Sequence, residues 1–136
     1  MRKRKFWGWG YADELLSAEE EKNIDSRIAK TFQLDDIETL PIPKVEDIDL
    51  PKPRLGAPSA LAKVISEDKE ERLNHTYGKS FPDAARSLLK DFSSPPDLVA
   101  FPNTEDELIN VMDWCDESNI AVIPYGGGSS VCGGVE

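Results

Sequence analysis

The feature that most restricts the fold of this chain is an uncharged run near its end, where four apolar residues are followed, after Pro124 and Tyr125, by three consecutive glycines. Residues 120–123 (Ile-Ala-Val-Ile) have the continuous apolar character of a strand buried on both faces. In α/β proteins, ligands bind beyond the carboxyl ends of such strands. The position of the glycines therefore favours a ligand-binding loop, and a flexible Gly/Ser surface turn is the alternative. The loop comprises Pro124, Tyr125, Gly126, Gly127, Gly128, Ser129, Ser130 and Val131.

The residues before this loop predict a strand and a helix. Residues 97–102 form a short apolar run bounded by prolines, and Thr104 with Glu107 makes a capping box that begins a helix. Asn119 suits the left-handed position that ends a helix. We expect strand, helix and strand in order, with parallel strands and a right-handed crossover. Apolar residues recur at i, i+3, i+4 and i+7, which predicts the buried helix face: Leu108, Val111, Met112 and Cys115.

The first two thirds of the chain are more polar and rich in proline. Ser17 and Glu20 form another capping box, and the helix after them carries one apolar stripe. Residues 41–58 hold five prolines and predict an extended linker. Further helices are expected over 59–72 and from Ser80 onward. We therefore predict an α+β protein with a helical and Pro-rich extended region over 1–92. The start of a ligand-binding domain follows over 93–136.

The distribution of charge narrows the function. The chain has 26 acidic and 16 basic residues, a net charge of −10, which argues against nucleic-acid binding. Residues 93–136 contain no Lys or Arg, so an anion bound there must be held by backbone N–H groups and hydroxyls, unless later sequence supplies cations. Successive glycines suit this task because they reach positive φ and allow close approach. With no cation in this segment, we expect a diphosphate bridge whose charge is shared among many amides.

Several other classes of site are not indicated by the sequence. Cys115 and Cys132 fit no metal-ligand spacing, and a reducing cytoplasm is the expected location. His75, the only histidine, has no ligand cluster at a suitable spacing and is interpreted as a capping or surface residue. Glycine, proline and serine make residues 118–135 unsuitable as a transmembrane segment, and the start of the chain is too polar for a signal peptide.

Residues 6–11 (Phe-Trp-Gly-Trp-Gly-Tyr) concentrate aromatic side chains at the start of the chain. Such a cluster most often docks onto another part of the same protein, and we expect that here. The alternative function for the chain rests on this segment. It is a non-catalytic α/β adaptor that binds a protein partner through residues 6–11 and needs no cofactor.

The segment 96–136 resembles the first βαβ unit of the FAD-binding domain of the vanillyl-alcohol-oxidase (PCMH) type. That family has a loop of the form P-x-G-G-G-[TS]-S-V, and this chain has Ser129 where Thr is usual. Two further motifs are similar to the alkyldihydroxyacetonephosphate synthases and their FAD-linked oxidase cousins. These are Trp9-Gly10-Tyr11 and the run His75-x-x-Gly78-Lys79-Ser80.

The resemblance implies a flavin-dependent oxidoreductase with FAD as cofactor and residues 124–131 around its pyrophosphate. Family members are far longer, so we expect this chain to be the opening part of one, inactive alone. The catalytic residues and the substrate domain would lie downstream. The parent would act on a small molecule: either a fatty alcohol replaces the acyl group of a dihydroxyacetone-phosphate ester, or a 2-hydroxy acid loses a hydride. A homodimer is a further expectation.

Overall fold

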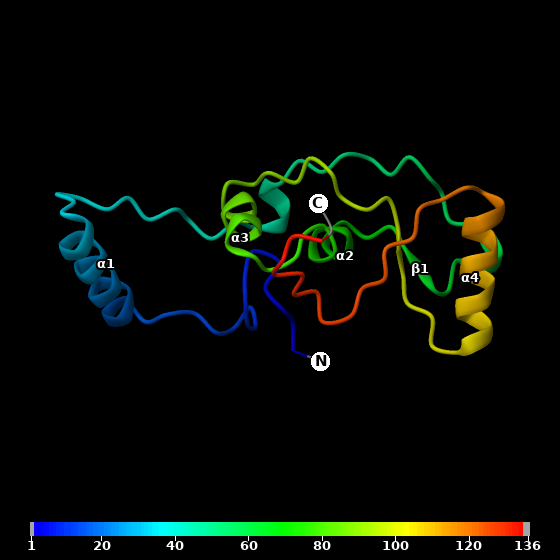
Figure 1. Cartoon of the computed structure of the whole chain (residues 1–136), viewed down its shortest axis with the longest axis horizontal. Coiled ribbons are helices and arrows are strands. Elements are labelled where there is room, and N and C mark those ends of the chain that lie inside the picture. Colours follow the sequence, from blue (N-terminus) through cyan, green and yellow to red (C-terminus); the bar gives the residue numbers. More distant parts are fainter. Residues whose placement is uncertain (1, 135–136) are drawn as a thin grey trace.

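The computed structural model describes residues 2–134 and contains helices with one small sheet, the α+β composition that the sequence predicts. Figure 1 shows α1 at one end of the molecule and α4 at the other, with α2 and α3 between them. The elements in chain order are α1 (Ala18–Phe32), β1 (Ile65–Ser66), α2 (Lys69–Asn74), α3 (Phe81–Leu88), β2 (Val99–Ala100) and α4 (Glu105–Glu117).

Helix α1 forms where the capping box predicts it. The Ser17 side chain accepts from the Glu20 N–H, and the Glu20 carboxylate accepts from the Ser17 N–H. The helix ends at Gln33, which takes a left-handed conformation with φ of 54°. It stands apart from the remaining helices (Figure 1). Its apolar stripe, which includes Phe32, is consequently exposed along the part of the chain that the structure describes.

The sheet joins different segments from those predicted. Strands β1 and β2 pair antiparallel, with Ile65 opposite Ala100 and Ser66 opposite Val99. Beyond β2, the Phe101 N–H donates to the Val64 carbonyl at 2.7 Å. Residues 120–123 are not a strand, so the parallel pairing with 97–102 is not formed within residues 2–134.

The helix predicted over 59–72 is wrong in its extent, because the segment is divided into three parts. A single 3₁₀ turn covers Ser59–Leu61, β1 follows, and α2 begins only after Asp68. The Asp68 carboxylate accepts from the N–H groups of Glu70 and Glu71, which makes it a strong N-cap. Apolar periodicity alone could not reveal this late start, since Ile65 of β1 is apolar too.

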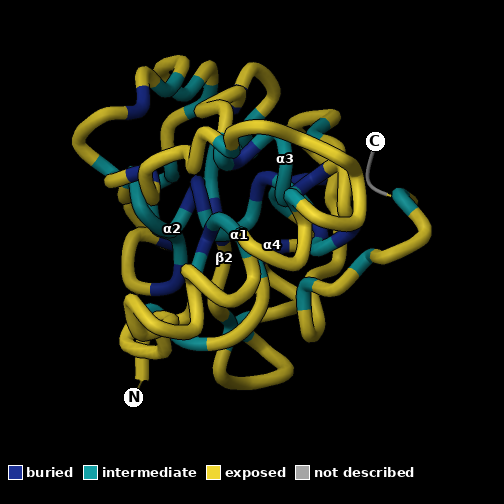
Figure 2. The backbone as a smooth tube through the Cα atoms, turned by 90° about the vertical axis from the view of Figure 1, so that its left-hand side faces the viewer, coloured by how far each residue is buried: buried dark blue, intermediate teal, exposed yellow. Residues whose placement is uncertain are grey.

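Two small hydrophobic clusters form the interior, seen as the dark blue stretches inside the tube in Figure 2. The second cluster joins residues on both sides of the predicted 92/93 boundary, and so does the β1–β2 pair. The boundary itself stays a prediction. The first cluster is Phe6, Ile48, Leu73 and Phe92, and the second is Leu61, Val64, Val111 and Cys115.

Helix α4 buries only half of its predicted face. Val111 and Cys115 are buried, whereas Leu108 and Met112 are 47% and 46% exposed. The sequence correctly predicts the helix, its Thr104 cap and the left-handed Asn119 after it, with φ of 53°. The other half of the face would need a neighbouring strand, and 120–123 does not provide one in the described chain.

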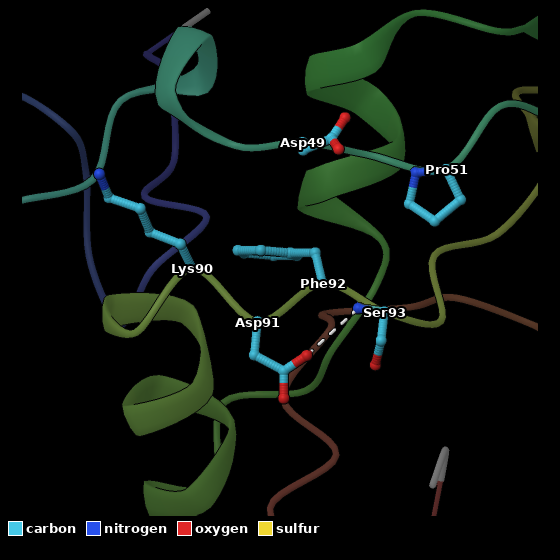
Figure 3. A pocket seen from close by; sticks show the side chains of 6 residues that line it. All are labelled: Asp49, Pro51, Lys90, Asp91, Phe92 and Ser93. Atoms are coloured by element: carbon cyan, nitrogen blue, oxygen red, sulfur yellow. Dashed lines mark hydrogen bonds between the residues drawn. The ribbon is translucent and has the colours of Figure 1, made fainter.

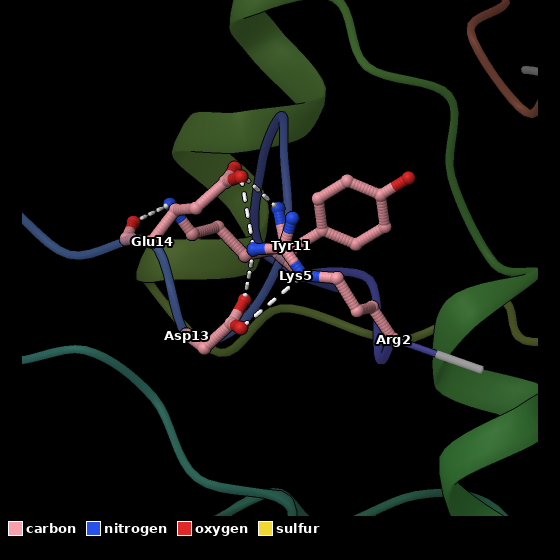
Figure 4. A network of polar contacts seen from close by, with 5 residues as sticks. All are labelled: Arg2, Lys5, Tyr11, Asp13 and Glu14. Atoms are coloured by element: carbon pink, nitrogen blue, oxygen red, sulfur yellow. Dashed lines mark hydrogen bonds and ion pairs between the residues drawn. The ribbon is translucent and has the colours of Figure 1, made fainter.

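The first residues of the chain fold into a tight hairpin, which we call the N-terminal hairpin (residues 3–12). Arg4 and Tyr11 form an isolated antiparallel bridge, and the Ala12 N–H donates to the Lys3 carbonyl. Figure 4 shows the polar network around it, in which Arg2 binds the carboxylates after the hairpin and covers the Tyr11 ring. Phe6 is buried in the first cluster, so the predicted docking of residues 6–11 onto the chain itself is formed there.

Candidate functional site

The glycine loop (residues 124–131) begins after the extended residues 120–123, and Figure 1 shows this red segment running back from α4 toward α2. Tyr125 fixes the start of the loop. Its hydroxyl donates to the Asn74 carbonyl at 3.2 Å, and its ring lies 4.1 Å from the His75 ring, centroid to centroid. Burial raises the pKa of Tyr125. The loop is therefore held against the end of α2.

The three glycines have different roles in this loop. Gly128 has a φ of 67°, and the Tyr125 hydroxyl occupies the space that a Cβ atom would need. Gly126 and Gly127 have open space within 4 Å of where a Cβ atom would stand, and neither is among the residues with positive φ. Of the three glycines, only Gly128 uses positive φ, whereas Gly126 and Gly127 leave space for close approach. Ser130, with φ of 31°, provides the next turn.

The backbone donors at the centre of the loop have no partner in the part of the chain that the structure describes. Within residues 2–134, none of the five N–H groups of residues 126–130 donates a hydrogen bond. Unpaired N–H groups on successive residues can converge on an anion, as in a backbone nest. The hydroxyls of Ser129 and Ser130 add further donors. These five N–H donors lie beside the open space at Gly126 and Gly127, and this arrangement suits a phosphate group. The residues present therefore fit the diphosphate of a dinucleotide such as FAD.

A second wall of the site was missed by sequence reasoning. Residues 75–79 lie directly against the glycine loop, and the Lys79 N–H donates to the Ser129 carbonyl at 2.6 Å. A Cβ atom at Gly78 would stand only 2.7 Å from the Ser130 Cβ and 2.9 Å from the Ser129 carbonyl oxygen. Gly78 is needed here for close approach. The motif His75-x-x-Gly78-Lys79-Ser80 was the available signal, but its spatial position beside the loop was not deducible.

His75 has the predicted capping role. It is the C-cap residue of α2, and its Nδ1 lies 2.7 Å from the Glu71 carbonyl oxygen. Its ring also contacts Phe101 at 5.6 Å between centroids. His75 thus ends α2 and packs against the ring of Tyr125.

The electrostatic environment of the loop differs from the expectation. Residues 93–136 carry no cation, but folding brings Lys79 and Arg4 close from elsewhere in the chain. The positive charge of Arg4 acts to lower the pKa of Tyr125 and that of Lys79. Burial is the main cause of the lowered pKa of Lys79. An anion at the glycine loop would therefore be held by backbone amides in a field that these two cations make more positive.

Two hollows lie near these residues. A large open groove of about 1420 Å³ is lined by the glycine loop, by 75–78 and by the apolar side of α4. The smaller pocket in Figure 3, about 310 Å³, is lined by Asp49, Pro51, Lys90, Asp91, Phe92 and Ser93 and includes no loop residue. Only the groove brings the predicted site residues together.

Other kinds of site are not formed by the described residues. Over 2–134, no group of three or more metal-ligating side chains could hold a metal ion. In the same range, no helix is both long and apolar enough to cross a membrane. Cys132 is exposed and Cys115 is buried, with its pKa raised by burial, and both are free thiols.

Comparison with known proteins shows what this segment is similar to. Residues 96–136 match the FAD binding domain family. The chain is 36% identical over 94 residues to the alkyldihydroxyacetonephosphate synthase of Trypanosoma brucei brucei, covering 64% of this chain and 15% of that protein. The synthase of Dictyostelium discoideum is 31% identical over 112 residues, covering 79% of this chain and 18% of that protein. The mitochondrial D-lactate dehydrogenase (cytochrome) 1 of Saccharomyces cerevisiae is 24% identical over 136 residues, covering 93% of this chain and 23% of that protein.

The fold is found in a solved structure as well. A structure of an alkyldihydroxyacetonephosphate synthase superposes with a TM-score of 0.77 at 22% identity, covering 98% of this chain and 30% of that chain. This chain therefore spans less than a quarter of the length of the curated relatives described above. The adaptor alternative without a cofactor is not supported by these likenesses. Residues 96–136 match an FAD binding domain, and the chain is similar to the FAD-binding part of alkyldihydroxyacetonephosphate synthases.

Proposed function

We propose that residues 124–131 bind the pyrophosphate of FAD. The observation that carries this proposal is the set of five N–H groups on residues 126–130 that have no partner among residues 2–134, next to the open space at Gly126 and Gly127. The hydroxyls of Ser129 and Ser130 would donate to the same phosphates. FAD supplies the redox and covalent chemistry when bound, and the loop binds and orients it.

A pair of matched variants in the full-length protein tests this role. In the described chain a side chain at Gly127 would meet no protein atom within 4 Å, so Gly127→Val should leave the apo-protein as stable as wild type. It should nevertheless remove FAD, because the side chain would stand where the phosphate oxygens approach. Gly56→Val is the control, since Gly56 also has open space around it but lies in the Pro-rich segment. Flavin absorbance per protein and the apo-protein melting temperature decide the outcome. Wild-type FAD content in Gly127→Val would contradict the proposal.

We propose that the whole protein acts on a small-molecule substrate, as an alkyldihydroxyacetonephosphate synthase does. A fatty alcohol would replace the acyl group of a dihydroxyacetone-phosphate ester: the bond to the acyloxy group breaks, an ether bond forms, and a fatty acid leaves. No net oxidation occurs. The support is the likeness to two such synthases, which extends well upstream of the FAD binding domain.

A second activity is supported by the likeness to a D-lactate dehydrogenase over 136 residues. In that case a 2-hydroxy acid would be oxidised to a 2-oxo acid, and an external electron acceptor would take the two electrons. The two activities are separated by incubating the purified full-length protein with each substrate set. Formation of the ether product supports the first, and lactate-dependent dye reduction supports the second.

Three further features belong to the proposal. The binding domain would begin near residue 93, the protein would be cytoplasmic, and it would form a homodimer. The free thiols of Cys115 and Cys132 are consistent with a reducing compartment. Cell fractionation and light scattering of the full-length protein test the location and the oligomeric state, respectively.

A further inference from the structure

Lys79 contacts two parts of the chain that are distant in sequence. Its backbone N–H donates to the Ser129 carbonyl at 2.6 Å, within the glycine loop. Its side-chain ammonium donates to the carbonyls of Lys5 and Phe6, at 3.2 and 3.1 Å, within the N-terminal hairpin. One residue therefore joins the start of the chain to the loop that we propose binds FAD.

The Lys79 ammonium depends on the hairpin for its hydrogen-bond acceptors. Its ammonium is half-buried, and among the described residues its hydrogen-bond acceptors are these two carbonyls and no carboxylate. A charged group removed from water is costly unless hydrogen bonds compensate. The pKa of Lys79 is lowered mainly by burial and further by the charge of Arg4, against which Asp83 acts. Without the hairpin carbonyls, Lys79 would lose its compensation and would move toward solvent.

The hairpin itself is firmly held. Phe6 is buried against Ile48, Leu73 and Phe92, and its ring makes edge contacts with Trp7 at 5.0 Å and with Phe92 at 5.9 Å. The two carbonyls that Lys79 uses lie directly before and at this buried residue. The hairpin is therefore a fixed support and can define the position of Lys79.

The effect on the loop follows from the planarity of the peptide bond. The Ser129 carbonyl and the Ser130 N–H belong to one planar group and point in opposite directions. Because Lys79 fixes the Ser129 carbonyl, it also aims the Ser130 N–H away from itself. Gly78, packed against the same two serines, leaves this peptide little freedom to rotate. The Ser130 N–H is one of the five unpaired donors of the loop.

We propose that Lys79 is a positioning residue that couples the N-terminal hairpin to the FAD loop, so that the hairpin contributes to FAD affinity without touching the cofactor. This inference rests on the proposed function of residues 124–131. The hairpin would hold the Lys79 side chain and thereby fix the Lys79 main chain. The Lys79 N–H would then orient the Ser129–Ser130 peptide.

Variants of the full-length protein test the coupling. Lys79→Met keeps most of the side-chain length but removes the donors, and it should weaken FAD binding by about tenfold, equivalent to about 1.4 kcal/mol. Lys79→Arg retains donors and should restore part of the affinity. Lys63→Met, at an exposed lysine far from the loop in sequence, is the control and should bind FAD as wild type does. The measurements are FAD titration of the apo-protein by flavin fluorescence and the apo-protein melting temperature.

The decisive comparison removes the hairpin. Deleting residues 2–11 should weaken FAD binding to the same extent as Lys79→Met, and combining both changes should add little. Unchanged FAD affinity in the deletion variant would overturn the inference even if Lys79→Met failed to fold, and so would full additivity of the two changes. A wild-type protein that binds no FAD would overturn the proposed function and this inference together. Wild-type binding with an unaffected Lys79→Met variant would overturn the inference alone.

Discussion

The Tyr125 side chain folds back over Gly128, and its hydroxyl lies where the Cβ atom of any other residue at position 128 would be. The same hydroxyl donates to the Asn74 carbonyl, so the ring cannot move away without losing that bond. Gly128 also has a φ of 67°, which disfavours side chains independently of space. Two separate requirements thus meet at one glycine of the loop.

The first prediction concerns Gly128→Ala in the full-length protein. The added methyl group must displace the Tyr125 ring, so the loop should lose its contact with α2 as well as its FAD. We expect the flavin content of the purified protein to fall sharply and the apo-protein to melt at a lower temperature. In Gly126→Ala, by contrast, the stability should be unchanged, because no described atom lies within 4 Å of that Cβ position. Equal melting temperatures for both variants would contradict the structure of the loop.

The second prediction concerns the exposed side of α4. Leu108, Met112 and Ile123 leave apolar surface open to water in the described chain. Residues 1–136 expressed alone should therefore self-associate, bind a hydrophobic dye and lack a sharp unfolding transition. Replacing Leu108 and Met112 together by Lys should reduce dye binding and association. The same change at the buried Val111 should instead unfold the helix, as circular dichroism would report. A monomeric, cooperatively melting wild-type chain would contradict this prediction.

The third prediction separates two tryptophans of the N-terminal hairpin. Trp7 packs against the first hydrophobic cluster, whereas Trp9 is 60% exposed. Iodide should therefore quench Trp9 efficiently and Trp7 weakly, and Trp7 should emit at shorter wavelength. Variants that replace either residue by Phe, in a background without Trp114, make the two signals distinct. Equal quenching of both would show that the hairpin is not docked through Phe6 and Trp7.

The fourth prediction concerns the dependence of stability on pH. The side chain of Arg54 hydrogen-bonds Asp97 and lowers the pKa of that carboxyl below its ordinary value of 3.8, although partial burial opposes the shift. A carboxyl whose pKa is lowered on folding stabilises the protein above its unfolded pKa, and the contribution is lost as the pH falls toward the folded pKa. Carbon NMR of the Asp97 carboxyl should show a midpoint below 3.8 in the wild-type protein. Arg54→Gln should move that midpoint upward, and an unchanged midpoint would contradict the ion pair.

The sequence predicts the starts of helices correctly where a capping side chain hydrogen-bonds the first turn of its own helix. The capping residues Ser17, Ser80 and Thr104 all begin helices, because the cap interactions involve only residues three positions apart. The exception is the segment 59–72. There the N-cap is Asp68 and not Ser59, since the intervening residues are recruited into β1 by a partner far along the chain.

The long-range relationships could not be predicted in this way. The position of the glycine loop after an apolar segment predicts a ligand site, but the apolar character of 120–123 did not specify a strand partner. Likewise, the absence of Lys and Arg from residues 93–136 predicts that no cation lies near the loop. Folding then placed Lys79 against Ser129, which is a contact that no spacing rule describes.

The burial of Phe6 has a consequence for how the protein is made. Its partners Leu73 and Phe92 are synthesised long after it, and at roughly 5–20 residues per second the ribosome needs several seconds to reach them. During that time Phe6 and the aromatic residues beside it have no surface to pack against. Chaperones that bind exposed aromatic segments would therefore have access to residues 6–11 until Phe92 has been synthesised.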